Sequence, residues 1–273
     1  MIKTEVLTEI APIVGNENQA KDLIDYIKSN IPFQNEYLAM LNRYIGASDA
    51  SYGSLLDERA AAEIDPNIPI LVANDGDVSA LAGSIGLGKG KLMGLAMGTS
   101  EAVGYVDADQ NVLGWINELA FAPVDLQEGA MQDEWSTDFG VGCKYFSQDA
   151  VIKLAPWAGI EIPEDLTLAQ KLKFVQKLME EDDPRAIAVF ETIGAYLAYT
   201  VVLYSQFYDL DYLMLLGRVM SGKGGDTILR VCNEILADEY PELAAKCTVT
   251  LPDEKMRRVG QSVAAASLPA LKK

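Results

Sequence analysis

The segment KLMGLAMGTSEAVGYVDADQNVLG, residues 91–114, constrains the fold most, because its apolar runs predict two strands that follow each other directly. We expect these strands to reverse at the cluster of turn-forming residues at 107–111. Later apolar runs at 212–219 and 247–251 predict strands separated by a helix at 221–236. A hairpin pairs its strands antiparallel, whereas strands joined through a helix pair in parallel. The sequence therefore predicts an α/β domain with a mixed sheet and flanking helices.

The region before residue 70 follows a different pattern, because apolar residues such as Leu23 and Ile27 recur there at helical spacing. We therefore divide the chain into a mainly helical N-terminal segment, residues 1–69, and an α/β domain, residues 70–273. Further elements predicted for this domain are strands at 70–75 and 118–125 and helices at 77–88, 186–208 and 253–271. The apolar residues of the helical segment favour contact with a second copy, so we expect a homo-oligomer.

The charge balance limits the classes of partner. Forty acidic residues against 22 basic residues give a net charge of −18, which repels nucleic acids and anionic membrane surfaces. The longest apolar runs are interrupted before they reach the length of a membrane span, about 20 residues. The N-terminus lacks the layout of a signal peptide. We therefore expect a cytoplasmic protein that binds neither nucleic acid nor membrane.

The chain contains no histidine, which excludes Ser-His-Asp triads and histidine-bound metals. Its three cysteines, Cys143, Cys232 and Cys247, are too widely spaced for a cysteine zinc cluster. We expect no protein-bound metal site and no zinc. Any chemistry must use carboxylates, hydroxyls, lysines and backbone amides.

Three polar loops that contain small residues follow predicted strands: AND at 73–75, GTSE at 98–101 and GRVMSGKGGD at 217–226. Ligands of α/β sheets collect outside the ends of the strands. The sequence therefore predicts a single site where these loops meet.

Taken together in this order, the segments resemble the C-terminal lobe of the ROK family, the sugar kinases and sugar-responsive repressors of the actin/hexokinase-like superfamily. The resemblance covers residues 66–271. It rests on the order and spacing of ILVANDGDVSALAG (70–83), LAMGTSEAVGYVDADQNVLG (95–114), NELAFAPVD (117–125), GVGCKYFSQDAVIKLA (140–155) and the stretch from DDPRAIAVF to GGDTIL (182–229). It implies an RNase H-like (actin/hexokinase-like ATPase) fold and phosphoryl transfer from ATP, with Mg²⁺, to a sugar hydroxyl.

The resemblance also implies roles for three residues on the sugar side. Asp75 matches the catalytic base, a carboxylate within hydrogen-bond reach of the reacting hydroxyl. Asn74 and Glu118 match residues that bind the sugar. The alternatives are structural, because Asn and Asp before a helix also cap its free N–H groups and Glu118 is equally well explained as an exposed strand-end residue.

On the nucleotide side, Gly98, Thr99 and Ser100 match a hairpin whose amides approach phosphate. The glycines Gly217, Gly222 and Gly224 match the adenosine-side loop, and Lys223 either reaches phosphate or is a solvated turn residue. Glu101 opposes this role, since a carboxylate about 4 Å from a phosphate charge is disfavoured by roughly 4 kcal/mol. The objection fails if a cation intervenes or if the side chain points to the opposite face of its strand.

The sequence departs from the ROK pattern in three places. No DxGGT-type phosphate loop precedes residue 70, Phe121 stands where the family has a histidine, and only Cys143 remains of the zinc-binding cysteines. The first departure indicates a piece of a longer protein or a chain that has lost catalysis. Two functions therefore stay open: a sugar kinase-like protein that is impaired or incomplete, and a non-catalytic protein that binds a sugar or regulates in response to it.

Overall fold

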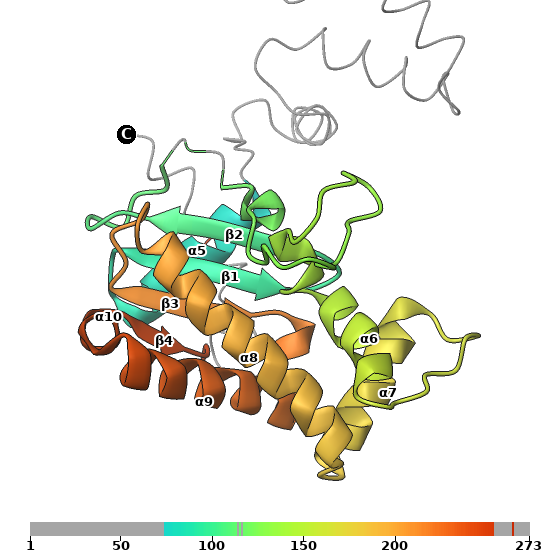
Figure 1. Ribbon diagram of the computed structural model, residues 1–273. Coiled ribbons are helices and arrows are strands. Elements are labelled where there is room, and N and C mark those ends of the chain that lie inside the picture. The colour runs from blue at the N-terminus through green and yellow to red at the C-terminus, as the bar shows by residue number, and fades with distance from the viewer. Residues whose placement is uncertain (1–73, 114, 116, 254–263, 265–273) are drawn as a thin grey trace, which may run out of the picture. The chain divides into compact units, whose positions relative to one another are not determined.

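The computed structural model describes residues 74–113, 115, 117–253 and 264 (Figure 1). The chain divides into two compact units, Met1–Val72 and Ala73–Lys273, and the described residues belong to the second. The helices predicted within residues 1–69, nearly all of the strand predicted at 70–75 and the terminal helix predicted at 253–271 lie outside the described residues, apart from helical Ala264.

The described residues form a four-stranded sheet in the order β2-β1-β3-β4. Strand β1 (Leu92–Met97) pairs antiparallel with β2 (Glu101–Val106) and parallel with β3 (Tyr212–Leu216). Strand β4 (Thr248–Thr250) adds a second parallel pair beside β3. The predicted mixed sheet is therefore confirmed.

The predicted position of the hairpin turn was wrong. Strand β1 ends at Met97 and β2 begins at Glu101, so the chain reverses at Gly98–Ser100, where the Gly98 N–H donates to the Ser100 carbonyl over 3.0 Å. The polar residues 107–111 form the next turn along the chain, closed by the Asp107 N–H bond to the Asn111 carbonyl. Turn-forming residues occur at both places, and the longer cluster was misleading.

The strand predicted at 118–125 was also wrong. This segment forms a short 3-10 helix, η1 (Leu119–Phe121), and then an irregular loop with one isolated bridge between Pro123 and Val141. Proline has no N–H to give to a strand ladder. The next two residues, Val124 and Asp125, both donate their N–H groups to the Gly140 carbonyl instead.

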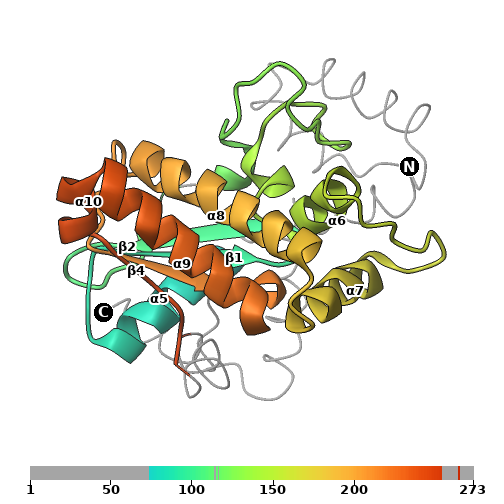
Figure 2. The same ribbon diagram turned by 60° about the horizontal axis from the view of Figure 1, so that its bottom comes forward.

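Helices cover both faces of the sheet (Figure 1 and Figure 2). Helices α8 and α9 lie on one face, and α5 lies on the other. Their bounds, with those of the remaining helices, are α5 Asp75–Leu87, α6 Gln148–Trp157, α7 Leu168–Glu180, α8 Pro184–Tyr204, α9 Gly222–Glu239 and α10 Pro241–Lys246. The three predicted helices at 77–88, 186–208 and 221–236 correspond to α5, α8 and α9.

Helix α5 packs on the sheet through backbone atoms. A side chain at Gly104 would collide with the Gly76 carbonyl, and the nearest atom to a Cβ at Gly94 would be the Ala80 nitrogen, at 2.9 Å. Such close approach requires residues without side chains at the contact. The seam fixes the first turn of α5 against β1 and β2, at the edge of the sheet where β1 ends.

Helix α8 is long and apolar enough to cross a membrane by length and composition. Half of its apolar window is buried inside the domain. At Gly194 it approaches the backbone of α9 closely, since a Cβ there would lie 2.9 Å from the Ile228 carbonyl oxygen. These contacts are those of a core helix in a folded domain.

Candidate functional site

A cleft of about 410 Å³ opens at the end of β1. It lies between the first turn of α5, the hairpin turn and the segment before η1. Its lining comprises Asn74, Asp75, Ala96, Gly98, Thr99, Ser100, Glu101, Ala102, Val103, Asn117, Glu118 and Ala120. Six of the residues predicted for the site therefore line one cleft: Asn74, Asp75, Gly98, Thr99, Ser100 and Glu118.

Asn74 and Asp75 occupy the start of α5. Asn74 has extended backbone dihedrals and its Oδ1 accepts the Gly76 N–H over 2.8 Å, so Asn74 is the N-cap of the helix. Its Nδ2 donates to Glu118 Oε1 over 3.5 Å. Asp75 is the first residue of the helix, and its exposed carboxyl borders the cleft. The capping alternative holds for Asn74 and in part for Asp75, because Asp75 Oδ1 also accepts the Gly76 N–H, over 2.9 Å. The catalytic role of Asp75 stays a prediction.

The hairpin turn forms the opposite wall of the cleft. It is anchored from below, because the Gly98 carbonyl accepts the Gln148 N–H at the start of α6 over 2.9 Å. Thr99 and Ser100 are exposed. Gly98 has no crowding neighbour, since the nearest atom to an added Cβ would be 3.6 Å away. The absence of a side chain there leaves room for a ligand to approach the backbone.

Glu101 lines the cleft but is almost fully buried. Like Val103 and Tyr105 on the same face of β2, it is turned toward the core and is 5% exposed. Its Oε1 accepts the Tyr204 hydroxyl at 3.4 Å, whereas its Oε2 is buried without a hydrogen-bond partner. Burial raises the pKa of Glu101 to about 8, so the carboxyl is mostly neutral at pH 7. The predicted repulsion of phosphate is therefore largely removed.

Asn117 was missed in the sequence and borders the same cleft. Its Nδ2 donates to Asp77 Oδ1 over 3.1 Å, and its Oδ1 accepts the Tyr208 hydroxyl over 3.0 Å. Burial raises the pKa of Asp77, and the hydrogen bond from Asn117 opposes this rise. Asp77 also lies in the first turn of α5, where an acidic residue is favourable. Its hydrogen bond gives it a structural role. The network ties the segment that carries Glu118 to α5. Its members lie far apart in sequence, which hides it from a motif search.

The glycines predicted for the adenosine side lie outside the lining of the 410 Å³ cleft. Gly217 has φ of 95° and packs on the Met97 carbonyl, one residue before the hairpin turn, so it belongs to the same edge of the sheet. Gly224 packs on the ring of Phe190. Packing alone accounts for Gly217 and Gly224, and their nucleotide role stays a prediction.

The side chain of Glu180, at the end of α7, packs against the first turn of α9. Glu180 Oε1 accepts the Lys223 N–H over 2.9 Å and lies where a side chain on Gly222 would be. The Lys223 ammonium donates to Asp182 Oδ1 over 2.6 Å and to the Glu180 carbonyl over 3.0 Å. Lys223 is thus paired at the end of α7.

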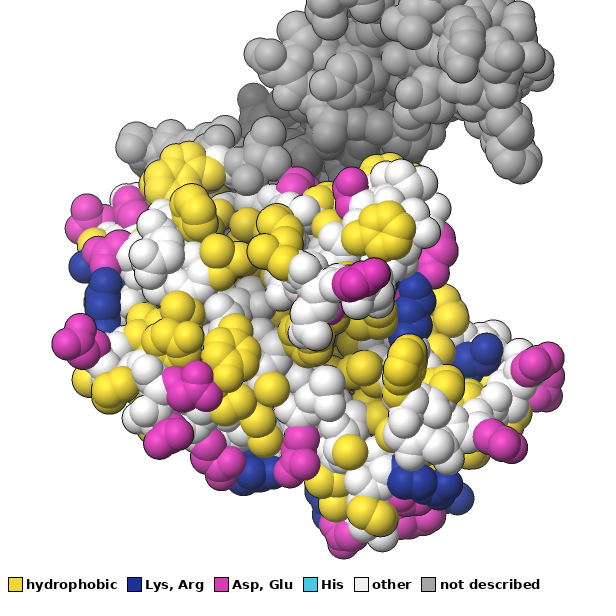
Figure 3. All heavy atoms as spheres, in the orientation of Figure 1, with side chains coloured by type: hydrophobic (Ala, Val, Ile, Leu, Met, Phe, Trp, Pro, Cys, Tyr) yellow, Lys and Arg dark blue, Asp and Glu magenta, His cyan; other side chains and the backbone are white. Residues whose placement is uncertain are grey.

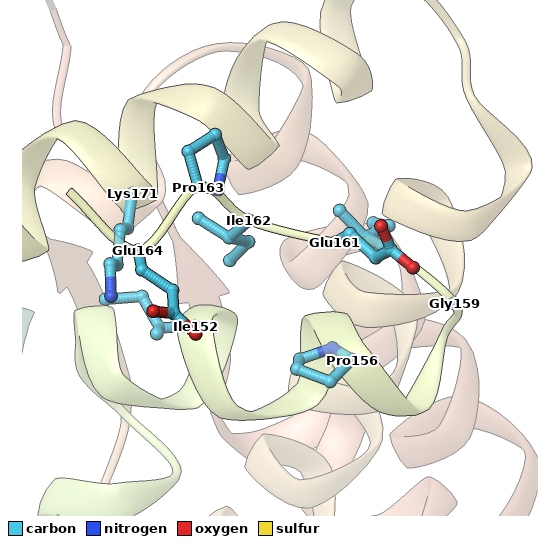
Figure 4. A pocket seen from close by; sticks show the side chains of 9 residues that line it. Ile152, Pro156, Gly159, Glu161, Ile162, Pro163, Glu164 and Lys171 are labelled. Carbon is cyan, nitrogen blue, oxygen red and sulfur yellow. The ribbon is translucent and has the colours of Figure 1, made fainter. Parts of the chain in front are cut away.

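A second hollow, of about 760 Å³, lies between α6, the segment after it and α7 (Figure 4). Its walls are mainly aliphatic and proline side chains, with Glu161, Glu164 and Lys171 at its border. It shares no residue with the cleft at the end of β1. It brings together none of the residues predicted for a site.

Within the described part of the chain, no group of three or more Cys, Asp or Glu side chains is placed to hold a metal ion. Cys143 is buried, and burial raises the pKa of its thiol to about 11.

No protein-family model matches the chain, and no curated protein matches it. Solved structures do. The ROK hexokinase from Thermus thermophilus matches with a TM-score of 0.60 and 16% identity, over 82% of this chain and 73% of that one. A ROK family transcriptional regulator, a homolog of the E. coli MLC protein, matches with a TM-score of 0.61 and 16% identity, over 79% of this chain and 56% of that one.

A ROK family glucokinase from Streptomyces griseus, in complex with glucose and AMPPNP, matches with a TM-score of 0.59 and 16% identity, over 77% of this chain and 71% of that one. A ROK family protein from Streptococcus pneumoniae in complex with sucrose matches with a TM-score of 0.57 and 12% identity, over 78% of this chain and 71% of that one. The mixed sheet with flanking helices is that of the actin/hexokinase-like fold. The chain has the fold of the ROK proteins.

Proposed function

We propose that the chain is a ROK-type sugar kinase-like protein that binds a sugar in the cleft at the end of β1. The observation that carries this proposal is the meeting of Asn74, Asp75 and Glu118 with the Gly98–Ser100 turn around a single cleft. Sugar binding needs a few convergent polar groups that fix the orientation of hydroxyls, and this cleft supplies them. A cytoplasmic location and assembly with a second copy belong to the same proposal.

In the proposed reaction, a sugar hydroxyl lies within hydrogen-bond reach of Asp75. Its oxygen attacks the terminal phosphorus of ATP as Asp75 takes the hydroxyl proton, and ADP leaves with the electrons of the broken P–O bond. Asn74 and Glu118 hold neighbouring hydroxyls. The Asn74–Glu118 hydrogen bond keeps these two side chains on one wall of the cleft.

The Gly98–Ser100 turn is the proposed phosphate contact. It offers two hydroxyls, on Thr99 and Ser100, and an uncrowded backbone at Gly98. Because Glu101 is buried and mostly protonated at neutral pH, its charge opposes phosphate only weakly. Mg²⁺ bound with the nucleotide would neutralise phosphate charge, and Gly217, Gly222 and Gly224 are proposed to face the adenosine side.

A second candidate function, a non-catalytic sugar-binding or regulatory protein, is favoured by one observation. The first turn of α9, where the nucleotide side is proposed, already holds the Glu180 carboxylate, and Lys223 is paired with Asp182. Such a surface disfavours a further anion. The two candidates share the sugar and differ in the nucleotide.

Calorimetric titration separates them. The purified chain is titrated with hexoses and N-acetylhexosamines, and separately with AMPPNP and Mg²⁺. Binding of both a sugar and AMPPNP, together with ADP release in a coupled assay, is the result expected for the kinase. Binding of sugar without AMPPNP supports the second candidate. Binding of neither class would remove the sugar proposal altogether.

A further inference from the structure

An aromatic pair borders the proposed sugar cleft. Phe121 follows Ala120, which lines the cleft, and its ring centroid lies 5.6 Å from that of Trp135 at an interplanar angle of 39°. Phe121 is 38% exposed and Trp135 is 82% exposed. In Figure 1 the loop that carries Trp135 rises near the start of β2, and in Figure 3 hydrophobic side chains are exposed there next to acidic and basic ones.

The turn that presents Trp135 is held firmly by hydrogen bonds. The Asp133 carboxylate accepts the backbone N–H groups of Trp135 and Ser136, at 3.2 and 2.7 Å. The Asp133 backbone bonds to Thr137 and Asp138, at 2.9 and 2.8 Å. An exposed indole on a fixed turn loses little conformational entropy when a ligand binds it.

A buried charge anchors this turn from below. The Lys144 ammonium, 6% exposed, lies 3.0 Å from Asp133, 2.6 Å from Glu134 and 2.8 Å from Asp149. Burying an ammonium group costs desolvation energy that only close partners offset. A buried lysine therefore holds, through its ion pairs, a turn whose largest side chain is left in water, an arrangement that suits a binding surface.

The size of the cleft limits what it encloses. At about 410 Å³ it is at the small end of the range for ligand sites, roughly 300–1,000 Å³. One sugar ring and a phosphate group fill such a space. A second ring must lie outside it, and from the side of Glu118 the next surface along the chain is the Phe121–Trp135 pair.

Resting on the proposed function, we propose that Phe121 and Trp135 form a second sugar subsite and that the preferred ligand is a disaccharide. The first ring lies among Asn74, Asp75 and Glu118, and the apolar face of the second ring packs on the indole of Trp135. Aromatic side chains suit such a ligand because they offer large apolar area at low entropic cost. Gln132 and Asp138 on the same turn are exposed, and the Gln132 amide donates to the Thr137 carbonyl over 2.9 Å.

The test compares matched ligands on matched variants. Dissociation constants for glucose, maltose, cellobiose and sucrose are measured by calorimetry on the unaltered chain, on Trp135→Ala and on Trp157→Ala. Trp157, 91% exposed at the end of α6, is the control for loss of a surface indole. We expect one disaccharide to bind at least tenfold tighter than glucose, and this ratio to fall about tenfold in Trp135→Ala and stay unchanged in Trp157→Ala. Phe121→Leu, which keeps an apolar side chain, is expected to lower the ratio less.

Several results would overturn the subsite. If glucose binds and no disaccharide binds more tightly, the subsite falls while the proposed function stands. If Trp135→Ala weakens the binding of glucose and of the disaccharide equally, the indole affects the cleft and does not form a separate subsite. A change of sedimentation coefficient in Trp135→Ala, without a change in the ratio, would make the aromatic pair a contact between copies. If no sugar binds at all, both proposals fall.

Discussion

Two surfaces along the same edge of the sheet are built in opposite ways. The cleft beside α5 is open and leaves the Asp75 carboxyl and the Thr99 and Ser100 hydroxyls exposed. The first turn of α9 is closed by Glu180, whose carboxylate already accepts a backbone N–H there. One surface is therefore open to a ligand, whereas the other is already filled by a side chain of the same chain. The proposed sugar binding and the proposed nucleotide binding involve different parts of the chain, and each can be tested alone.

The largest effect on activity is expected from a substitution in the open cleft beside α5. Asp75→Asn removes the proposed base with little change in size, so we expect any phosphoryl transfer to fall by roughly 10²–10⁴-fold. The free energy of unfolding should change by less than about 1 kcal/mol, because Asn74 provides the cap of α5. Steady-state kinetics and thermal unfolding measure the two quantities. Asp109→Asn, in the exposed 107–111 turn, is the control, and full activity in Asp75→Asn would exclude the base.

The stability of the domain is expected to depend on pH through Glu101, which lines the cleft. The pKa of Glu101 rises from 4.5 to about 8 on folding, so the folded chain keeps a proton that the unfolded chain releases. Stability is therefore fully present below pH 4.5 and is lost as the pH rises toward 8, by on the order of 4 kcal/mol.

Urea unfolding of Glu101→Gln at pH 5 and pH 8 tests this. The neutral amide should remove most of the pH dependence and make the variant more stable than the original chain at pH 8. Glu128→Gln, in an exposed loop, controls for the loss of one carboxylate. Equal slopes against pH in the two variants would show that Glu101 titrates normally.

The backbone contact between Gly104 of β2 and the first turn of α5 is expected to tolerate no added side chain. Gly104→Ala places a methyl group against the Gly76 carbonyl, and overpacking of this kind costs about 1–3 kcal/mol. Gly98→Ala meets no atom closer than 3.6 Å, so its unfolding free energy should change by less than about 0.5 kcal/mol while AMPPNP affinity falls. Urea unfolding and calorimetry compare the pair. Equal destabilisation in both would mean that Gly98 has a structural role.

The smallest effect, on AMPPNP affinity, is expected at the first turn of α9, which Glu180 fills. Glu180→Ala removes the carboxylate from the first turn of α9, so we expect AMPPNP to bind up to about tenfold more tightly, about 1.4 kcal/mol. Glu181→Ala makes the same change of net charge at the neighbouring residue, which is paired with Lys177 on the surface. If the two variants behave alike, the effect is one of overall charge and the closed side does not bind nucleotide.

Local patterns in the sequence predicted much of the fold. The apolar runs that became β1, β2 and β3 and the small-residue run that became α5 were enough for a mixed sheet. Two local errors, the position of the hairpin turn and the strand at 118–125, arose where turn signals competed or where Pro123 interrupted an apolar run.

Two of the three loops predicted to meet, 73–75 and 98–101, contribute residues to one cleft, whereas the loop 217–226 lies outside its lining. What the sequence did not reveal depends on contacts between distant residues. Asn117 is held by Asp77 and Tyr208, which are 40 and 91 residues away. The burial of Glu101 follows from α8 and its Tyr204, 103 residues further along the chain. Patterns of residue spacing along the sequence do not reveal contacts between residues so far apart.

The backbone seam between α5 and the sheet has a consequence for how a chain of this kind diversifies. Mutation can enlarge, shrink or recharge a side chain, but it cannot reshape a contact made of main-chain atoms at Gly76, Gly94 and Gly104. The acid at the start of α5 is therefore carried on a contact that leaves no room for side chains. New ligand preferences would arise more readily in the loop from 122 to 139 than at Asn117 and Glu118, which are bonded to α5 and its cap.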